Sequence, residues 1–352
     1  MTKLKVVGSG ALVEETLFKP AATVAPPPKL ALARPDGNNF TPIGTGKPLT
    51  VEVAHVYTGK YPGTILGSSP MLITSSVKNL DETGASAEAV NFLIKKVGKR
   101  SNFSGPPADA QGTRLISYVP AVTAVSTTVT LNLVFENFPD AAFDEIGSVF
   151  SGVAQLPIFL TQSPYLIGAG SILKVVQDIG DAIFNGRPNF NPTFTVNFSD
   201  IGPATDAGYE VYFKSKDDTD AANKNFTFVP NQGLIDPRTN APYDGDAPYF
   251  VIAIDGAERP SLKGFAPLAA TANILSTFFN IKDGGSIPVN DILNVFKAKN
   301  DVDYGKRALS AKAAIAAAQA AGQDTTALQQ QLKADLADIQ DQDLAKLFNN
   351  AQ

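Results

Sequence analysis

From Ile146 to Leu173 the chain carries no Asp, Glu, Lys or Arg, although these residues make up 18% of the sequence. A charge-free run of this length has to be mostly buried. It follows the strongest strand pattern, TVTLNLVFE at 128–136, and leads into KVVQDIGDAIF at 174–184, which has helical spacing. We therefore expect the centre of the fold here, with a helical insertion at about 140–187.

The same run is long enough to cross a bilayer, which takes about 20 apolar residues. Its centre holds polar side chains and two prolines, namely Gln155, Pro157, Thr161, Gln162, Ser163 and Pro164. Unsatisfied polar groups are costly in lipid, so we expect a buried connection and no transmembrane span. Contact with a membrane is the minority alternative. The first residues predict no cleavable signal peptide, because Glu14 and Glu15 interrupt a short apolar run.

Composition excludes several kinds of site. A net charge of −5 argues against a nucleic-acid partner, which needs a concentrated basic face. The absence of cysteine excludes disulfides, thiolate nucleophiles and sulfur-ligated zinc. The single histidine, His55, excludes metal centres built on several histidines.

Residues 49–260 predict one β-rich domain. Strand patterns recur between loops rich in Gly, Pro and Ser, at 49–58, 71–78, 114–122, 128–136, 192–200, 207–216, 224–231 and 247–256. We expect a mainly β fold with α additions, built on an antiparallel β-sandwich of the C2-like or jelly-roll-like kind. A short helix is also predicted at 86–98, with Ser86 as N-cap, because four apolar residues share one helical face: Val90, Leu93, Ile94 and Val97.

Both ends of the chain differ from this domain. Residues 1–48 are rich in Pro and Gly and predict an extended N-terminal arm. Residues 261–352 predict a helical region that ends in an antiparallel hairpin, with a break at Gly322 and Asp324 as N-cap. The second helix of the hairpin has a narrow apolar stripe at Leu328, Leu332, Leu336 and Ile339.

No catalytic motif emerges. His55 lies within a strand pattern, on the side of Val51 and Val53, and no G-x-S-x-G elbow accompanies it, which favours a structural histidine. The glycine patterns at 5–13 and 44–48 fit neither a dinucleotide fingerprint nor a phosphate loop, in which Pro48 would replace the magnesium ligand.

Acidic residues gather in two predicted loops, which favours a weak calcium hypothesis. Calcium is held by carboxylate and carbonyl oxygens from loops that converge. The residues are Asp217, Asp218 and Asp220 in one loop and Asp236, Asp244 and Asp246 in the other. Ordinary turn chemistry is the alternative interpretation. We expect no other cofactor.

A basic group follows the predicted helix at 86–98. It consists of Lys95, Lys96, Lys99 and Arg100. Such residues complement the dipole at a helix C-terminus. An anionic membrane or partner surface is the alternative.

Three classes of function remain open. The first is a non-enzymatic structural or assembly protein, whose arm and C-terminal helices contact neighbouring subunits or other protein partners. The second is a β-sandwich module that binds a ligand or acts on a membrane, with calcium as a candidate cofactor. The third is a hydrolase based on a pair of Asp or Glu residues, which would need a cleft with two close carboxylates. The sequence favours the first class.

Overall fold

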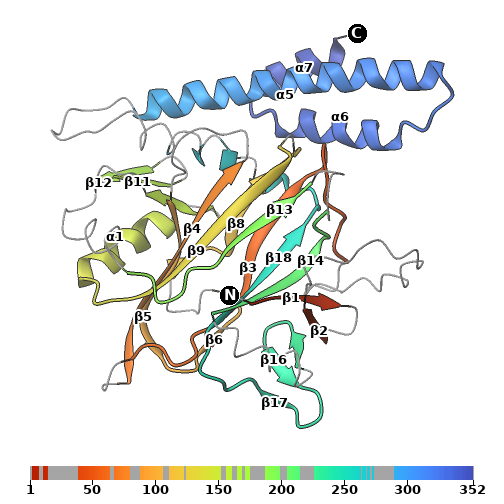
Figure 1. The fold of residues 1–352 in the computed structure, drawn as a ribbon. Coiled ribbons are helices and arrows are strands. Elements are labelled where there is room, and N and C mark those ends of the chain that lie inside the picture. Colours follow the sequence, from red (N-terminus) through yellow and green to blue (C-terminus); the bar gives the residue numbers. More distant parts are fainter. Residues whose placement is uncertain are drawn as a thin grey trace.

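Two antiparallel β-sheets and a layer of C-terminal helices make up the fold (Figure 1). The computed structural model describes residues 2–7, 11–14, 39–63, 67–79, 88–105, 111–122, 124–151, 156–160, 165–168, 171–174, 187–198, 204–214, 226–262, 264–266, 268–269, 272 and 289–351. The prediction of a mainly β fold, a β-sandwich with helical additions, is confirmed.

The first sheet contains ten of the described strands, all paired antiparallel. In spatial order it runs β17 (Ala241–Pro242), β16 (Gly233–Asp236), β15 (Thr227–Val229), β2 (Ala11–Glu14), β1 (Thr2–Val7), β14 (Gly208–Phe213), β18 (Tyr249–Asp255), β3 (Leu49–Tyr57) and β6 (Asn102–Phe103), and β8 (Leu115–Val119) also pairs with β3. Its long central strands β3 and β18 are buried at nearly every residue, because both faces of this sheet are covered.

The second sheet contains eight of the described strands. Its order is β12 (Ser171–Lys174), β11 (Tyr165–Gly168), β10 (Ile158–Leu160), β5 (Glu88–Gly98), β4 (Ser68–Asn79), β9 (Ser126–Phe135) and β13 (Thr193–Asn197), and β7 (Gln111–Gly112) also pairs with β5. On β9 the predicted alternation is clear: Val129, Leu131 and Leu133 point into the sandwich. Thr128 and Thr130 point outward, where their hydroxyls bond those of Thr195 and Thr193 on β13.

Each outer face of the sandwich has its own cover. Outside the second sheet, helix α1 (Asp140–Ser151) and residues 262–272 bury Ile146, Leu156 and Leu268 against strands β4 and β5. Outside the first sheet, an aromatic cluster that includes Tyr209 and Tyr249 packs under the β15–β16 hairpin. Three cores therefore stack through the body, one between the sheets and one on either side.

The predicted helix at 86–98 is wrong, because this segment is strand β5. Val90 and Leu93 of β5 pack in the core beside α1, and Phe92 and Ile94 pack in the core between the sheets, so both faces of the strand are buried. A strand buried on both faces loses its period-two pattern, and the remaining apolar spacing imitated a helix.

The charge-free run is also less helical than predicted. Helix α1 ends at Ser151, and β10, β11 and β12 then extend the second sheet within the predicted insertion at about 140–187. The predicted helix at 174–184 lies outside the described residues, apart from its first residue, which ends β12. Several described residues of the run are buried as expected, among them Ile146, Ile158 and Phe159 in the core beside α1.

The predicted extended arm is wrong for its first part. Residues 2–14 contribute β1 and β2, which pair with β14 and β15 of the same chain. Near its end, Phe40 packs edge-on against Tyr209, and the Thr41 amide donates to Asp255 Oδ1 at 2.8 Å. The described parts of 1–48 thus pack on their own body, while 15–38 lie outside the described residues. The division at 48 and 260 stays a prediction.

The C-terminal region forms the predicted antiparallel hairpin. It consists of α5 (Val289–Ala320), α6 (Thr326–Asp338) and a further helix, α7 (Gln342–Asn350). Gly322 has φ +68°, as a helix-ending glycine does, and Asp324 Oδ1 accepts from the Thr326 amide although the N-cap is Thr325. Figure 1 shows α6 between α5 and the strand ends of the body. In the described residues, no helix has both the length and the apolarity to cross a bilayer.

Candidate assembly surface

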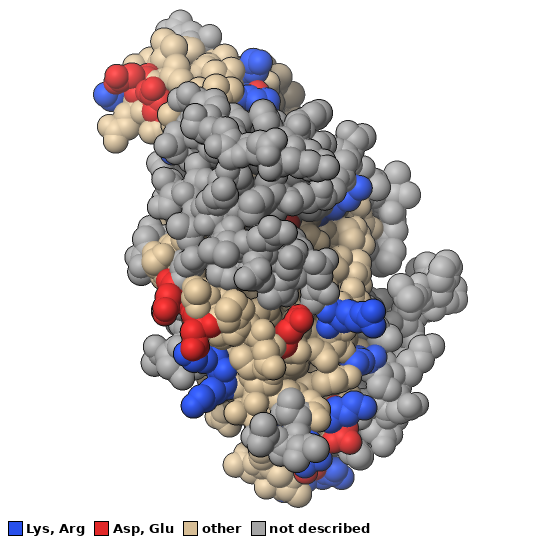
Figure 2. All heavy atoms as spheres, turned by 90° about the vertical axis from the view of Figure 1, so that its left-hand side faces the viewer, with Lys and Arg blue, Asp and Glu red and all other residues tan. Residues whose placement is uncertain are grey.

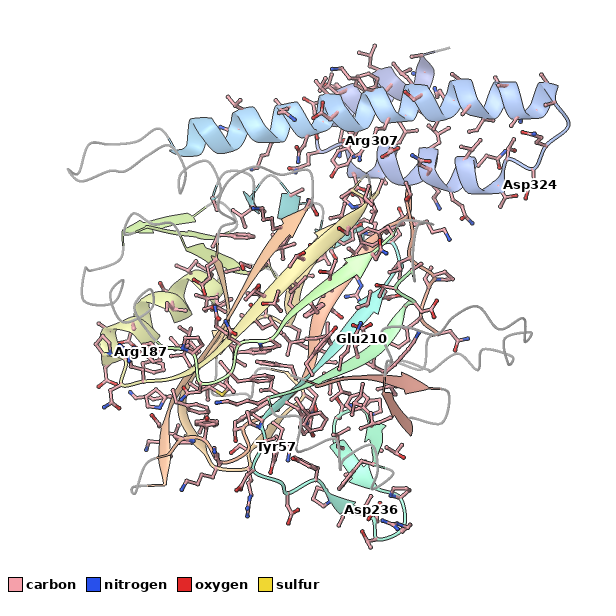
Figure 3. The ribbon with its side chains drawn as sticks, in the orientation of Figure 1. Tyr57, Arg187, Glu210, Asp236, Arg307 and Asp324 are labelled. Atoms are coloured by element: carbon pink, nitrogen blue, oxygen red, sulfur yellow. The ribbon has the colours of Figure 1, made fainter. Side chains whose placement is uncertain are left out.

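A buried polar cluster anchors the helical layer on the body. Arg307 of α5 donates from Nη1 to the backbone oxygen of Ala121 at 3.5 Å, and its guanidinium lies 4.4 Å from the centre of the Tyr304 ring (Figure 3). Its Nε is 3.3 Å from Asp335 Oδ1 on α6, an ion pair that lacks hydrogen-bond geometry. These contacts fix α5 and α6 to each other and to the loop after β8.

Asp335 is the member of this cluster whose charged form is disfavoured by burial. It is fully buried, and neither carboxylate oxygen accepts a hydrogen bond from the described residues. Burial raises the pKa of Asp335 to about 6, against the attraction of Arg307, which lowers it. Burial also raises the pKa values of Tyr118 and Tyr304 nearby, and the charge of Asp338 adds to both shifts.

A second set of contacts holds α7 along α5. The buried carboxylate of Asp301 accepts from the Gln340 amide at 2.7 Å and from the Asp341 amide at 3.0 Å. Eleven residues further along α5, Lys312 Nζ donates to the carbonyls at the end of α7, including that of Ala351 at 2.7 Å. Cations at a helix C-terminus are favourable, so α7 is clamped at both ends and runs parallel to α5.

Between these clamps the two helices are in close contact. A Cβ at Gly305 would lie 2.1 Å from Cε2 of Phe348, so the phenyl ring rests directly on the glycine. Only a residue without a side chain allows this approach.

The side of α5 away from α6 carries a row of exposed apolar side chains. Five large hydrophobic side chains are exposed in the described part of the chain, and four of them lie on α5 and α7. They are Val295 (64% exposed), Val302 (38%), Leu309 (36%) and Leu347 (61%), and we call them the α5–α7 face. Tyr304, Ala308 and Ala311, which face α6, are buried. A set of exposed hydrophobics gathered on one helical face is typical of an interaction surface.

Charged side chains border this face. On α5, Lys299 is paired with Asp303 at 2.5 Å, and Lys306 lies exposed one turn further on. On α7, Asp343 is paired with Lys346 at 3.2 Å. Figure 2 shows another side of the molecule, the left-hand side of Figure 1, where described basic and acidic side chains are interspersed.

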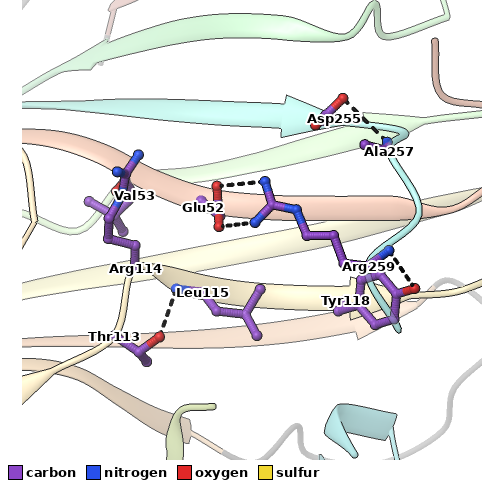
Figure 4. Close-up of polar contacts among 9 residues, drawn as sticks. All are labelled: Glu52, Val53, Thr113, Arg114, Leu115, Tyr118, Asp255, Ala257 and Arg259. Atoms are coloured by element: carbon purple, nitrogen blue, oxygen red, sulfur yellow. Dashed lines mark hydrogen bonds and ion pairs between the residues drawn. The ribbon is translucent and has the colours of Figure 1, made fainter. Parts of the chain in front are cut away.

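The segment that leads from the first sheet to the helices is fixed by a second ion pair (Figure 4). Arg259 Nη1 lies 2.7 Å from Glu52 Oε1 on β3, and the Arg259 amide donates to the Tyr118 hydroxyl at 3.2 Å. Asp255 Oδ1 accepts from the Ala257 amide at 3.3 Å. A hollow of about 410 Å³ beside this segment and α6 contains one carboxylate, Glu258, among its described lining residues.

His55 is a buried structural residue, but not on the predicted side of its strand. Pairing with β18 skips Ala54, since Ile252 faces Val53 and Val251 faces His55. This bulge turns the imidazole away from the inner core and stacks it on Tyr249, 5.8 Å between ring centres.

The hydrogen bonds of His55 suit a neutral ring. Its Nε2 donates to Asn102 Oδ1 at 2.9 Å, and its Nδ1 accepts from the Ser104 hydroxyl at 2.8 Å. Burial lowers the pKa of His55 to about 4, although the bond to Asn102 raises it.

The described residues do not bring the predicted calcium ligands together. Asp236 bonds Arg238 within its own turn, and Asp246 Oδ1 is 3.1 Å from Arg100 (Figure 3 labels Asp236). No group of three possible metal ligands occurs among the described residues. Asp217, Asp218 and Asp220 lie outside them, so the calcium hypothesis that joins these three to Asp244 and Asp246 stays a prediction.

The predicted basic group does not end a helix. Lys95 lies on strand β5, where it pairs with Asp140 in the first turn of α1 at 2.6 Å. This hydrogen bond raises the pKa of Lys95 and lowers that of Asp140. Arg100 follows the strand with φ +57°. The interpretation of these residues as a helix-dipole cap is therefore wrong.

Sequence reasoning located the hairpin but missed its exposed face. The signal was present, because Val295, Val302 and Leu309 are each seven residues apart. No family model, curated protein or solved structure matches the chain.

Proposed function

We propose that this protein is a non-enzymatic assembly protein, which binds a neighbouring protein subunit through the α5–α7 face. One observation carries the proposal: four of the five exposed large hydrophobic side chains in the described residues lie on these two helices. Exposed apolar area on a rigid element is the part of a surface that gains most from being covered.

The anchoring of the helical layer supports this function. A binding surface is preorganised only if the helices that form it are held in place on the body. Here Arg307 ties α5 to the loop after β8 and to α6, while Asp301 and Lys312 hold α7 in place. The face is therefore presented on helices whose positions are fixed, as preorganised binding surfaces are.

The arm has a smaller part in this proposal than the sequence predicted. Its described residues pair with β14 and β15 and pack on Tyr209 of the same chain. We therefore assign the contact with neighbours to the helices.

The test is the mass of the protein in solution, measured by gel filtration with light scattering. We expect a mass above the 37.0 kDa of one chain, and a return to it in the double variant Val302→Lys/Leu309→Lys. Val125→Lys is the matched control, because Val125 is 55% exposed but lies on the body. If the purified wild-type protein keeps the mass of one chain even at high concentration, assembly through this face is contradicted.

A further inference from the structure

We propose that the neighbour is a second copy of this chain, and that the two copies form a two-fold dimer in which the α5 helices run parallel. This inference rests on the proposed function, whose test is self-assembly of this chain, and adds the two-fold symmetry and the orientation of the two copies. It follows from the spacing of the exposed residues and from the charges beside them.

The spacing identifies the occupant as a helix. Val295, Val302 and Leu309 lie at every seventh position of α5, and the exposed Ala316 continues the series. Apolar residues at every seventh position form a row that runs nearly along the helix axis, with one apolar position in each heptad, so a second helix can pack lengthwise against it. The stripe turns away from α6, so a second helix reaches it without displacing any described contact of the hairpin.

Two different rims flank this stripe. Gly305, against which the Phe348 ring of α7 packs, lies three residues after Val302 and four before Leu309. Lys306 lies four residues after Val302 and three before Leu309, on the other side. One rim of the stripe is therefore α7, and the other is the side of α5 with Lys306 and with Lys299, which pairs with Asp303.

The direction of α7 places its side chains. It runs parallel to α5, from Asp341 beside Asp301 to Ala351 beside Lys312. With Phe348 turned to α5, the right-handed turn of α7 brings Leu347 to the side of the stripe and Asp343 to its outer edge. The α5–α7 face is thus one apolar strip with Asp343, which pairs with Lys346, on the α7 rim and with Lys306 on the other rim.

A two-fold axis along the helices exchanges these rims. The Lys306 rim of one copy then lies against the α7 rim of the other, so that Lys306 approaches Asp343 on both sides of the dimer. An axis across the helices would make them antiparallel and place lysines against lysines. Charge complementarity therefore favours the same face of a second copy, in the parallel orientation.

Absence of cysteine makes the orientation directly testable, since a single introduced cysteine has no competitor. The variants are Val295→Cys, Val302→Cys and Leu309→Cys, each oxidised and analysed on a non-reducing gel. In the parallel dimer each residue meets its own counterpart, so all three variants are expected to cross-link. Val125→Cys, exposed on the body, is the control and is expected to remain a monomer on the gel.

The outcomes separate this inference from the proposed function. A wild-type mass of twice 37.0 kDa, lost in Val302→Lys/Leu309→Lys, together with cross-links at all three positions, supports both. If the mass is raised and the lysine variant lowers it, but only Val302→Cys cross-links, assembly holds and the parallel orientation is overturned. A wild-type monomer overturns both.

Charge variants test the rims without changing the apolar face. Lys306→Asp is expected to raise the dissociation constant about threefold or more, because exposed charge pairs contribute modestly. Asp343→Lys is expected to do the same, and the double variant to restore the wild-type value. The pairing is refuted if the double variant loses as much binding free energy as the two single variants together. Far-UV circular dichroism of each variant checks that it is folded.

Discussion

Replacing Asp335 by Asn changes the pH dependence of stability in a way that the structure fixes in sign and size. Asp335 is fully buried beside Arg307 and accepts no hydrogen bond from the described residues. Its pKa is raised from 3.8 to about 6 by burial. The folded protein therefore holds a proton that the unfolded chain releases.

The sign follows from this difference in proton binding. Between about pH 4 and pH 6 the unfolded chain ionises Asp335 and the folded protein does not, so wild-type stability falls as the pH rises. A shift of about two units at about 1.4 kcal/mol each gives about 3 kcal/mol in total, of which about 2 kcal/mol falls between pH 4 and pH 8. Asn has no such titration. We expect the free energy of unfolding of Asp335→Asn, minus that of the wild type, to increase by about 2 kcal/mol over this range.

Urea unfolding at both pH values, at one protein concentration, measures this difference. Asp144→Asn makes the same substitution at an exposed position of α1 and is the control, for which we expect a difference near zero. The reasoning is refuted if the Asp335→Asn difference stays constant with pH, or if it decreases as the pH rises.

Three further predictions concern the helices and the histidine. Gly305→Ala places a Cβ on the Phe348 ring, so amide exchange in α7 should accelerate about tenfold, whereas Gly63→Ala, with open space around its Cβ, should leave it unchanged. Lys312→Met removes three hydrogen bonds to the end of α7 and should cost about 1–2 kcal/mol in urea unfolding; an unchanged midpoint would contradict the clamp. His55 should titrate by NMR near pH 4, with stability lost as the pH falls from about 6.5 to about 4; a midpoint near 6.5 would contradict its burial.

The sequence predicted best the strands that have one covered face, or that lie between loops rich in Gly, Pro and Ser. β9 alternates Thr with Val and Leu because its outer face meets solvent and β13. β5 was misread as a helix because it is buried on both faces. Local spacing carries no information on which elements cover a segment, and the two faces of β5 are covered by α1 and by the first sheet, whose residues lie elsewhere in the chain.

The candidate surface was predictable in part. The antiparallel hairpin follows from Gly322 and from the Ala- and Leu-rich composition on both sides of it. The heptad of Val295, Val302 and Leu309 is written in the sequence, but the same spacing also occurs in helices that are buried. Which apolar stripe α6 covers depends on contacts such as Arg307 with Asp335, and these form only in the folded chain.

Asp301 gives the last helix a dependence that its position in the sequence does not suggest. The two amides that begin α7 donate to a carboxylate 39 and 40 residues earlier, which is itself buried. Deleting residues 340–351 would therefore remove both amides that donate to Asp301, together with the helix that packs beside it. Such a truncation would not shorten the protein by one peripheral helix; it would destabilise α5 at its middle, and with it the whole helical layer.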